Sequence, residues 1–125
     1  MASVMHRRVL ALGLDPAVVD PAAFPQFTAA QVRAFIDAQV ERVRQLGYEV
    51  ETCLVDGGRT AENVLAQHLD SQSFDCVVIG AGLRQPESLL LFEKLLNLVH
   101  ERAPSARICF NTTPADTAEA VQRWV

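Results

Sequence analysis

Two glycines and an arginine follow a short apolar run in FDCVVIGAGLR, residues 74–84. Gly80 and Gly82 match the first part of G-x-G-x-x-G, whose glycines let the backbone approach a pyrophosphate at the start of a helix. The third position holds Gln85, and the acidic residue that binds the ribose is missing about 20 residues further on. The pattern argues against a dinucleotide site, and we expect no cofactor.

A second pattern, Cys53-x5-Arg59-Thr60, has the spacing of the phosphate loop of protein tyrosine phosphatases. In that chemistry a thiolate attacks phosphorus, an arginine binds the oxyanion, and Asp15 would act as the general acid. The apolar pair after Cys53, residues 54–55, instead places the cysteine inside a strand, whereas a phosphatase cysteine begins its loop. The phosphatase reading therefore stays open as a less favoured alternative.

Apolar runs and helical patterns must position these residues, and they alternate along the chain. Prolines at 16, 21 and 25 exclude a continuous helix between the first two periodic segments. We predict strands over 8–14, 48–55, 76–79 and 106–110, and helices over 28–47, 60–69, 86–102 and 113–124. The order βαβαβαβα predicts one α/β domain over residues 1–125, a three-layer αβα sandwich with a flavodoxin-like parallel sheet of four strands in order 2-1-3-4.

In such a sheet, ligands bind at the carboxyl ends of the strands, where the strand order reverses. For order 2-1-3-4 this crevice lies between the first and third strands. The candidate residues there are Asp15, Gly80, Gly82 and Arg84, with Asp56, Asn111 and Thr112 at neighbouring strand ends. Glycine turns beside an arginine favour a small anion or a phosphate ester. Asp-Pro and Asp-Gly are also common turn sequences, which is the favoured interpretation of Asp15 and Asp56.

The helix predicted over 89–99 has an unusually wide apolar face of leucines, with Phe92 and Val99. Deep packing against the sheet would explain it, and so would a subunit interface. The fourth strand also has a free edge, which proteins usually cover or pair. We therefore expect a homodimer through this helix, the strand edge, or both.

The segment FDCVVIGAGLRQPESLLLFEKLLNLVHERAPSARICFNTTPADTAEAV resembles the middle of bacterial response-regulator receiver domains over about residues 74–121. Aligned this way, Gly80 occupies the phospho-acceptor position, where receivers carry aspartate, and Thr112 falls on their switch Ser/Thr. Asp15 alone stands where receivers place an acidic pair for Mg²⁺, and the strand with their lysine is missing. The resemblance implies a receiver-like fold that cannot be phosphorylated in the usual way. The chain also looks like small bacterial proteins of this type, a likeness that implies no activity.

The composition of the chain indicates which binding partners and which cellular compartment to expect. A net charge of −4 disfavours nucleic-acid binding, which needs a basic face, and no apolar run approaches the length of a membrane span. His6, His68 and His100 are too scattered for a metal cluster. Cys53, Cys76 and Cys109 lie in apolar runs and are expected to be buried reduced thiols. With no apolar signal segment before Arg8, these features predict a cytoplasmic protein.

The leading expectation is a non-phosphorylatable, receiver-like interaction module. It would act as a homodimer or through contacts with a protein partner. The alternative is a small enzyme or a binder of a phosphate-bearing or anionic small molecule at the strand ends. The apolar strand and the glycine turn are compatible with both hypotheses. The sequence identifies no catalytic residue for an enzyme.

Overall fold

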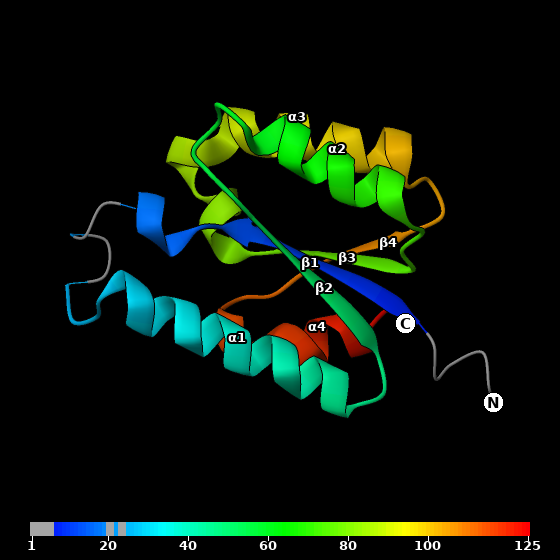
Figure 1. The fold of residues 1–125 in the computed structure, drawn as a ribbon, viewed down its shortest axis with the longest axis horizontal. Coiled ribbons are helices and arrows are strands. Elements are labelled where there is room, and N and C mark those ends of the chain that lie inside the picture. Colours follow the sequence, from blue (N-terminus) through cyan, green and yellow to red (C-terminus); the bar gives the residue numbers. More distant parts are fainter. Residues whose placement is uncertain (1–6, 20–21, 23–24) are drawn as a thin grey trace.

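A computed structural model describes residues 7–19, 22 and 25–125 of the chain. Its parallel sheet has the strand order β2-β1-β3-β4, as predicted (Figure 1). The strands are β1 (Arg8–Leu14), β2 (Glu49–Val55), β3 (Cys76–Ile79) and β4 (Arg107–Phe110). The flavodoxin-like three-layer arrangement is therefore confirmed.

Helices cover both faces of the sheet (Figure 1). On one side lie α1 (Ala29–Gln45) and α4 (Thr117–Gln122), and on the other α2 (Ala61–Ser71) and α3 (Leu89–Arg102). Since α1 leads away from β1 to one sheet edge and α2 returns past β1 to β3, the strand order reverses between β1 and β3. This is the predicted place for a ligand crevice.

Local sequence signals determine where α1 begins and ends. The Thr28 hydroxyl accepts a hydrogen bond from the Gln31 backbone N–H at 3.1 Å, and the Gln31 side chain accepts one from the Thr28 N–H at 2.8 Å. This reciprocal capping box satisfies two amide groups that have no partner within the helix. Gly47 follows the helix with a φ of +105°, a conformation that glycine adopts without steric cost. The predicted capping residue and stop signal are both confirmed.

Two of the predicted helices begin later than their sequence patterns indicate. Short 3₁₀ turns at Pro86–Ser88 and Pro114–Asp116 precede α3 and α4, and another covers Pro16–Val18. Each turn starts at a proline, whose ring sets φ for a first turn and supplies no N–H. Residues 15–27 were predicted to form no continuous helix. Pro21, one of the three prolines behind that prediction, lies outside the described residues.

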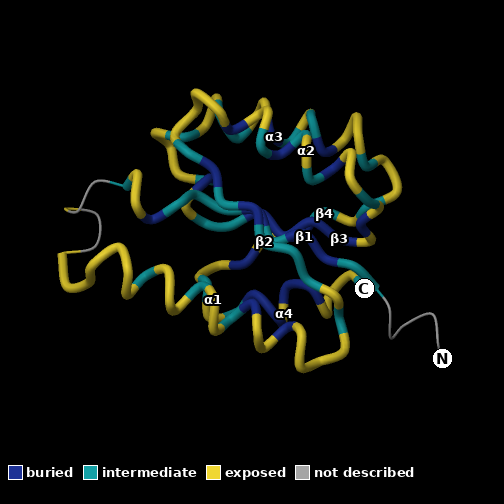
Figure 2. The backbone as a smooth tube through the Cα atoms, viewed as in Figure 1, coloured by how far each residue is buried: buried dark blue, intermediate teal, exposed yellow. Residues whose placement is uncertain are grey.

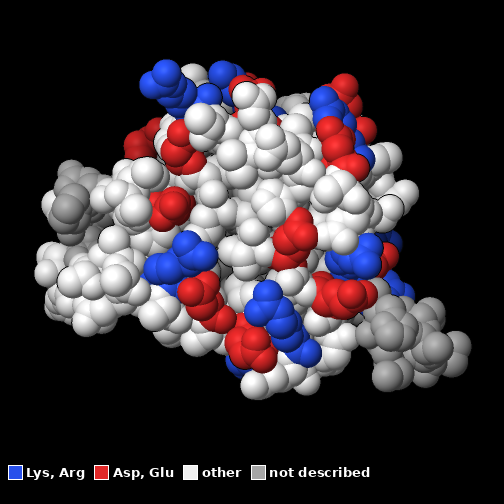
Figure 3. Space-filling model, in the orientation of Figure 1, with Lys and Arg blue, Asp and Glu red and all other residues white. Residues whose placement is uncertain are grey.

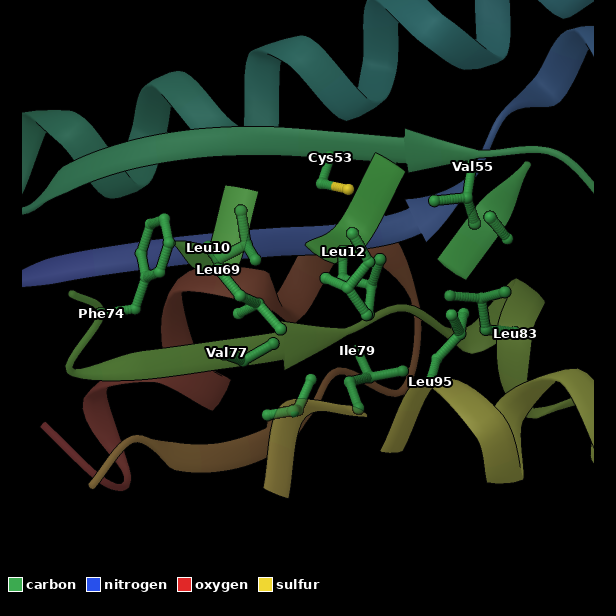
Figure 4. Close-up of a cluster of buried hydrophobic side chains, with 13 residues drawn as sticks. Leu10, Leu12, Cys53, Val55, Leu69, Phe74, Val77, Ile79, Leu83 and Leu95 are labelled. Carbon is green, nitrogen blue, oxygen red and sulfur yellow. The ribbon is translucent and has the colours of Figure 1, made fainter. Parts of the chain in front are cut away.

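The two faces of the sheet carry side chains of different size. Towards α2 and α3, the central strands present Leu10, Leu12, Val77 and Ile79, which pack with helix leucines in the larger core cluster (Figure 4). The face towards α1 and α4 is built from smaller residues, namely Val9, Cys76, Val78 and Cys109 with Ala118, Ala120 and Val121. In Figure 2 the sheet is mainly buried or intermediate, whereas much of α1 is exposed.

Helix α3 uses most of its wide apolar face inside the molecule. Its later apolar residues, Leu91, Phe92, Leu95, Leu96, Leu98 and Val99, all belong to or pack against the larger core. Leu89 and Leu90 at its start are instead 59% and 71% exposed. Packing against both the sheet and α2 therefore explains the breadth of the pattern after residue 90.

No helix among the described residues is both long and apolar enough to cross a membrane. On the face drawn in Figure 3, basic and acidic side chains lie interspersed, so this face offers no continuous basic surface.

Candidate functional site

A pocket of about 570 Å³ opens where the strand order reverses, between the sheet and α1. The carboxyl ends of β1 and β3 and the turns that follow them form one side, and α1 forms the other. This volume lies within the range of about 300–1,000 Å³ that is typical of small-molecule sites. The predicted crevice therefore coincides with a real cavity.

Small residues on one face of the sheet create this space. Successive residues of a strand point to opposite faces, so β1 directs Leu10 and Leu12 towards α2 and α3. Ala11 and Gly13 then face α1 and line the pocket together with Gly80 after β3. Because these side chains are small, they leave empty space between the sheet and α1.

Helix α1 covers the pocket with a stripe at helical spacing. Val32, Ile36, Gln39 and Val40 of this helix line the cavity. Val40 is buried against the protein, whereas the first three are only half-buried. The part of α1 up to Val40 thus spans the cavity, and Val43 further along packs in the smaller core cluster.

The lining is mainly apolar and carries little charge. Among the described residues that line the pocket, Glu87 alone is charged, and no lysine or arginine is present. A phosphate or carboxylate placed here would lose its hydration without gaining a cation in return. The pocket is better suited to an uncharged, apolar molecule.

Three of the seven predicted site residues lie in this lining, namely Gly80, Gly82 and Asn111. The other four, Asp15, Asp56, Arg84 and Thr112, are outside it. Each of these four has a local structural partner, described next.

Asp15 and Asp56 both close turns at strand ends. Asp15 Oδ1 accepts a hydrogen bond from the Ala17 N–H at 2.9 Å and caps the 3₁₀ turn after β1. Asp56 Oδ1 accepts from the N–H groups of Gly58 and Thr60, both at 3.1 Å. These hydrogen bonds lower the pKa of Asp56. Both carboxylates serve as turn acceptors, which was the favoured interpretation of Asp-Pro and Asp-Gly.

Arg84 connects the ends of two strands. Its guanidinium donates to the carbonyl oxygens of Ile79, at 3.3 Å, and Asn111. Its Cζ atom also lies 4.8 Å from the centroid of the Phe110 ring, a cation–π distance. The sequence suggested a side chain free to bind an anion, but the carbonyl groups of β3 and of the residue after β4 occupy it.

Asn111 and Thr112 belong to the turn that leads into α4. Asn111 is buried, accepts from the Ala81 N–H at 3.1 Å and donates to Thr117 Oγ1 at 3.1 Å. The Thr112 hydroxyl donates to Asp116 Oδ2 at 2.6 Å. Asn111 therefore joins the turn after β3 to α4, while Thr112 is part of a capping network.

The phosphatase reading of Cys53 is wrong. Cys53 lies within β2, is 1% exposed, and directs its sulfur into the leucine cluster (Figure 4). Burial raises the pKa of this thiol to about 12, so it is protonated at neutral pH. A buried, protonated sulfur is not a nucleophile for phosphate. All three cysteines are buried and free, as predicted.

The turn after β3 also differs from a dinucleotide-binding turn. Gly80 has ordinary extended backbone angles, φ −70° and ψ 155°, and begins a 3₁₀ turn rather than an α-helix. The next α-helix starts only at Leu89. No α-helix amino terminus therefore stands directly at the glycines to receive a pyrophosphate.

Gly80 lines the pocket and is hydrogen-bonded to β1. Its N–H donates to the Leu12 carbonyl at 2.8 Å, and a Cβ atom at this position would lie 3.4 Å from that oxygen. That distance is ordinary van der Waals contact, so the β1 backbone does not by itself require glycine here.

One further polar cluster lies at the β2 edge. The Glu51 carboxylate contacts His68 Nδ1 and accepts a hydrogen bond from the Gln72 amide. His68 and Glu51 are partly exposed, and the pair joins β2 to α2. Within the described part of the chain, no three or more His, Cys, Asp or Glu residues are grouped to hold a metal ion. His6 lies outside the described residues.

Sequence reasoning located the crevice but missed most of its lining. The overlooked signal is the alternation in RVLALGL, where Leu10, Leu12 and Leu14 interleave with Val9, Ala11 and Gly13. A strand with leucines on one face and shrinking side chains on the other predicts close packing on the first face and open space on the second.

Comparison with known proteins does not add a family to these observations. No protein-family model matches the chain, and no curated protein matches it either.

Proposed function

We propose that this protein binds a small, uncharged and mainly apolar molecule in the pocket between α1 and the sheet. The observation that carries the proposal is the pocket itself, about 570 Å³ in volume and lined mostly by apolar side chains at the switch in strand order. Pockets of this size and character bury most of a small ligand.

The charge of the lining selects the kind of ligand. The sequence suggested an anion, with Arg84 as its partner. Arg84 donates to two backbone carbonyls instead, and Glu87 is the charged residue of the described lining. An anion would therefore meet a carboxylate and no cation, so an uncharged ligand is favoured.

Filling the pocket tests this function. Ala11→Leu adds three carbon atoms to the floor, and Ala38→Leu makes the same change on the exposed side of α1. Nile red, an uncharged dye that fluoresces in apolar surroundings, serves as the probe. We expect the wild type and Ala38→Leu to bind Nile red, and Ala11→Leu to bind at least about tenfold more weakly, the loss of about 1.4 kcal/mol.

The stability of the same variants controls for misfolding. Because Ala11→Leu fills open space, its free energy of unfolding is expected to stay level or rise by about 0.5–2 kcal/mol, as for other cavity-filling changes. Overpacking would instead lower it by about 1–3 kcal/mol. Unchanged Nile red binding by a folded Ala11→Leu variant would refute the proposed site.

A second candidate function is the receiver-like interaction module, acting as a homodimer without phosphorylation of its own. Two observations favour it. Leu89 and Leu90 are largely exposed at the start of α3, and Gly80, aligned with the receiver phospho-acceptor, has no carboxylate. The buried free thiols suit a reducing compartment, so the cytoplasm remains the proposed location. Leu89 and Leu90 are not among the residues that line the pocket, so dimerisation through them does not exclude ligand binding.

A further inference from the structure

Several polar side chains interrupt the apolar lining of the pocket. Thr52 of β2 and Gln39 of α1 both line the cavity, and both are only half-buried. Within the described chain, neither the Thr52 hydroxyl nor the Gln39 amide has a protein hydrogen-bond partner, and the polar atoms of both remain accessible to water.

The secondary structure directs both side chains to the pocket. On β2, Cys53 and Val55 belong to the core cluster on the α2 and α3 side, so Thr52 between Glu51 and Cys53 points to the α1 side. On α1, Gln39 lies three residues after Ile36, in the same stripe that lines the cavity. Both side chains thus face the pocket.

The buried polar pair of the lining, Asn111 and Thr117, is already satisfied. Asn111 donates to Thr117 Oγ1 and accepts from the Ala81 N–H, and Thr117 donates to the Pro114 carbonyl at 2.7 Å. These groups hold the turn into α4 together and have little capacity left for a ligand. Gln85, Glu87 and Ser88 line the pocket beyond the turn after β3, and the Gln85 amide donates to the Ala81 carbonyl at 3.0 Å. On β2 and α1, the free hydrogen-bonding capacity lies with Thr52 and Gln39.

A purely hydrocarbon ligand would remove water from both groups and return no hydrogen bond. Leaving polar groups of a site unpaired is costly, and such sites discriminate strongly against ligands that lack the matching group. A charged oxygen is disfavoured by the lack of a cation in the described lining. An uncharged oxygen fits both constraints.

We propose that the ligand is an apolar molecule with an uncharged ketone or alcohol oxygen, and that Thr52 and Gln39 recognise this oxygen. The apolar body lies over the floor formed by Ala11 and Gly13. This inference rests on the proposed function, since it concerns the same pocket, and it makes Thr52 and Gln39 the residues that determine specificity.

Two fluorescent probes separate hydrogen bonding from simple burial. Prodan is an uncharged aromatic ketone whose emission moves to longer wavelength when its carbonyl accepts a hydrogen bond. Anthracene is an aromatic hydrocarbon that can only be buried. Each is titrated against the wild-type chain and four variants, Thr52→Val, Thr52→Ser, Gln39→Leu and Gln67→Leu.

The isosteric Thr52→Val removes the hydroxyl alone. We expect Thr52→Val and Gln39→Leu to bind prodan about 2- to 12-fold more weakly, as for loss of one hydrogen bond, and with emission at shorter wavelength. Anthracene binding is expected to stay equal or tighten. Thr52→Ser retains the hydroxyl and should keep prodan binding, and Gln67→Leu repeats the glutamine change on an exposed position of α2.

The outcomes distinguish this inference from the proposed function. If both probes bind but Thr52→Val and Gln39→Leu leave the affinity and emission of prodan unchanged, the recognition role is overturned and the pocket proposal stands. Equal losses for prodan and anthracene would mean that the substitutions distort the cavity, which also overturns the recognition role. Binding of neither probe to the wild type would refute the pocket proposal, and this inference with it.

Discussion

At the scale of single residues, the polar groups at the strand ends mainly stabilise turns. Asp116 is the clearest example, although the sequence pointed to Thr112 instead. Its carboxylate accepts hydrogen bonds from the Thr112 N–H at 2.8 Å, the Thr112 hydroxyl at 2.6 Å and the Thr113 N–H at 3.2 Å. Thr112 therefore acts as a donor within a cap, which leaves its hydroxyl committed.

Removing this carboxylate should weaken the start of α4. We expect Asp116→Ala to lower the free energy of unfolding by about 1 kcal/mol, as for other capping residues, measured by urea denaturation at neutral pH. Asp37→Ala is the control, because Asp37 forms an exposed i,i+4 ion pair with Arg33 that contributes little. Equal effects of the two substitutions would contradict the capping role.

The pH dependence of this difference follows from the lowered pKa of Asp116. The Thr112 side-chain hydrogen bond is the largest cause of the shift. A carboxyl group whose pKa is lower in the folded state stabilises the protein above its unfolded pKa of about 4. That contribution is lost as the pH falls through the folded pKa. The difference between wild type and Asp116→Ala should thus be full at pH 6 and shrink below about pH 4.

At the scale of elements, one side chain holds together two strand ends beside the pocket. Arg84 joins the carbonyls of Ile79 and Asn111 and contacts the Phe110 ring. We expect Arg84→Ala to lower the free energy of unfolding by about 2 kcal/mol, because charged hydrogen bonds to two carbonyls are lost. Arg84→Lys should restore only part of this, since an ammonium group cannot reproduce the planar fork.

Inorganic phosphate distinguishes this structural role from anion binding. When phosphate replaces chloride at matched ionic strength, the urea midpoints of the wild type and Arg84→Ala should shift equally, because phosphate stabilises folded proteins in general by exclusion from their surface. A phosphate-dependent rise that Arg84→Ala abolishes would show that Arg84 binds anions after all.

At the scale of the whole molecule, the exposed start of α3 and the neighbouring sheet edge form the proposed dimer surface. Leu89 lies one helical turn before Phe92, whose ring packs edge-on against Phe110 of β4 at a centroid distance of 5.9 Å. Phe110 itself is 41% exposed, and β4 is an edge strand. A two-fold dimer would place the same surface of both copies in contact.

Sedimentation equilibrium tests the dimer with matched leucines. We expect the wild type to dimerise and Leu89→Glu to weaken association at least about tenfold, because a carboxylate would be buried at the interface. Leu46→Glu, at a similarly exposed position after α1, should associate like the wild type. A wild-type chain that stays monomeric at high concentration would disprove the dimer.

The fold was predictable from sequence because its signals are local. Helical spacing with the Thr28 capping box and the Gly47 stop predicts α1, and an unbroken apolar run predicts the buried strand β3. Crossover connections between parallel strands are right-handed and consecutive strands are usually neighbours, which leaves few possible topologies. The order 2-1-3-4 is one of them. The predicted starts of α3 and α4 were a few residues too early. A proline favours the first turn of either helix type, so it does not indicate whether a 3₁₀ turn or an α-helix follows.

The candidate site was predictable only in its location. The switch in strand order indicated the crevice, and Gly80, Gly82 and Asn111 do line it. The partners of Arg84 could not be predicted, since they are backbone carbonyls 5 and 27 residues away that approach only in the folded chain.

By itself, the sequence determined the strand and helix order, the sheet topology, the buried cysteines and the edge where a ligand could bind. Only the tertiary structure decided which residues are available there. It directed Arg84 to carbonyl groups, enclosed Cys53 among leucines, and left an apolar cavity beneath α1 with Gln39 and Thr52 unpaired. The physical reason is that hydrogen-bond partners and empty volume depend on the distance between elements, whereas local patterns determine only the elements themselves.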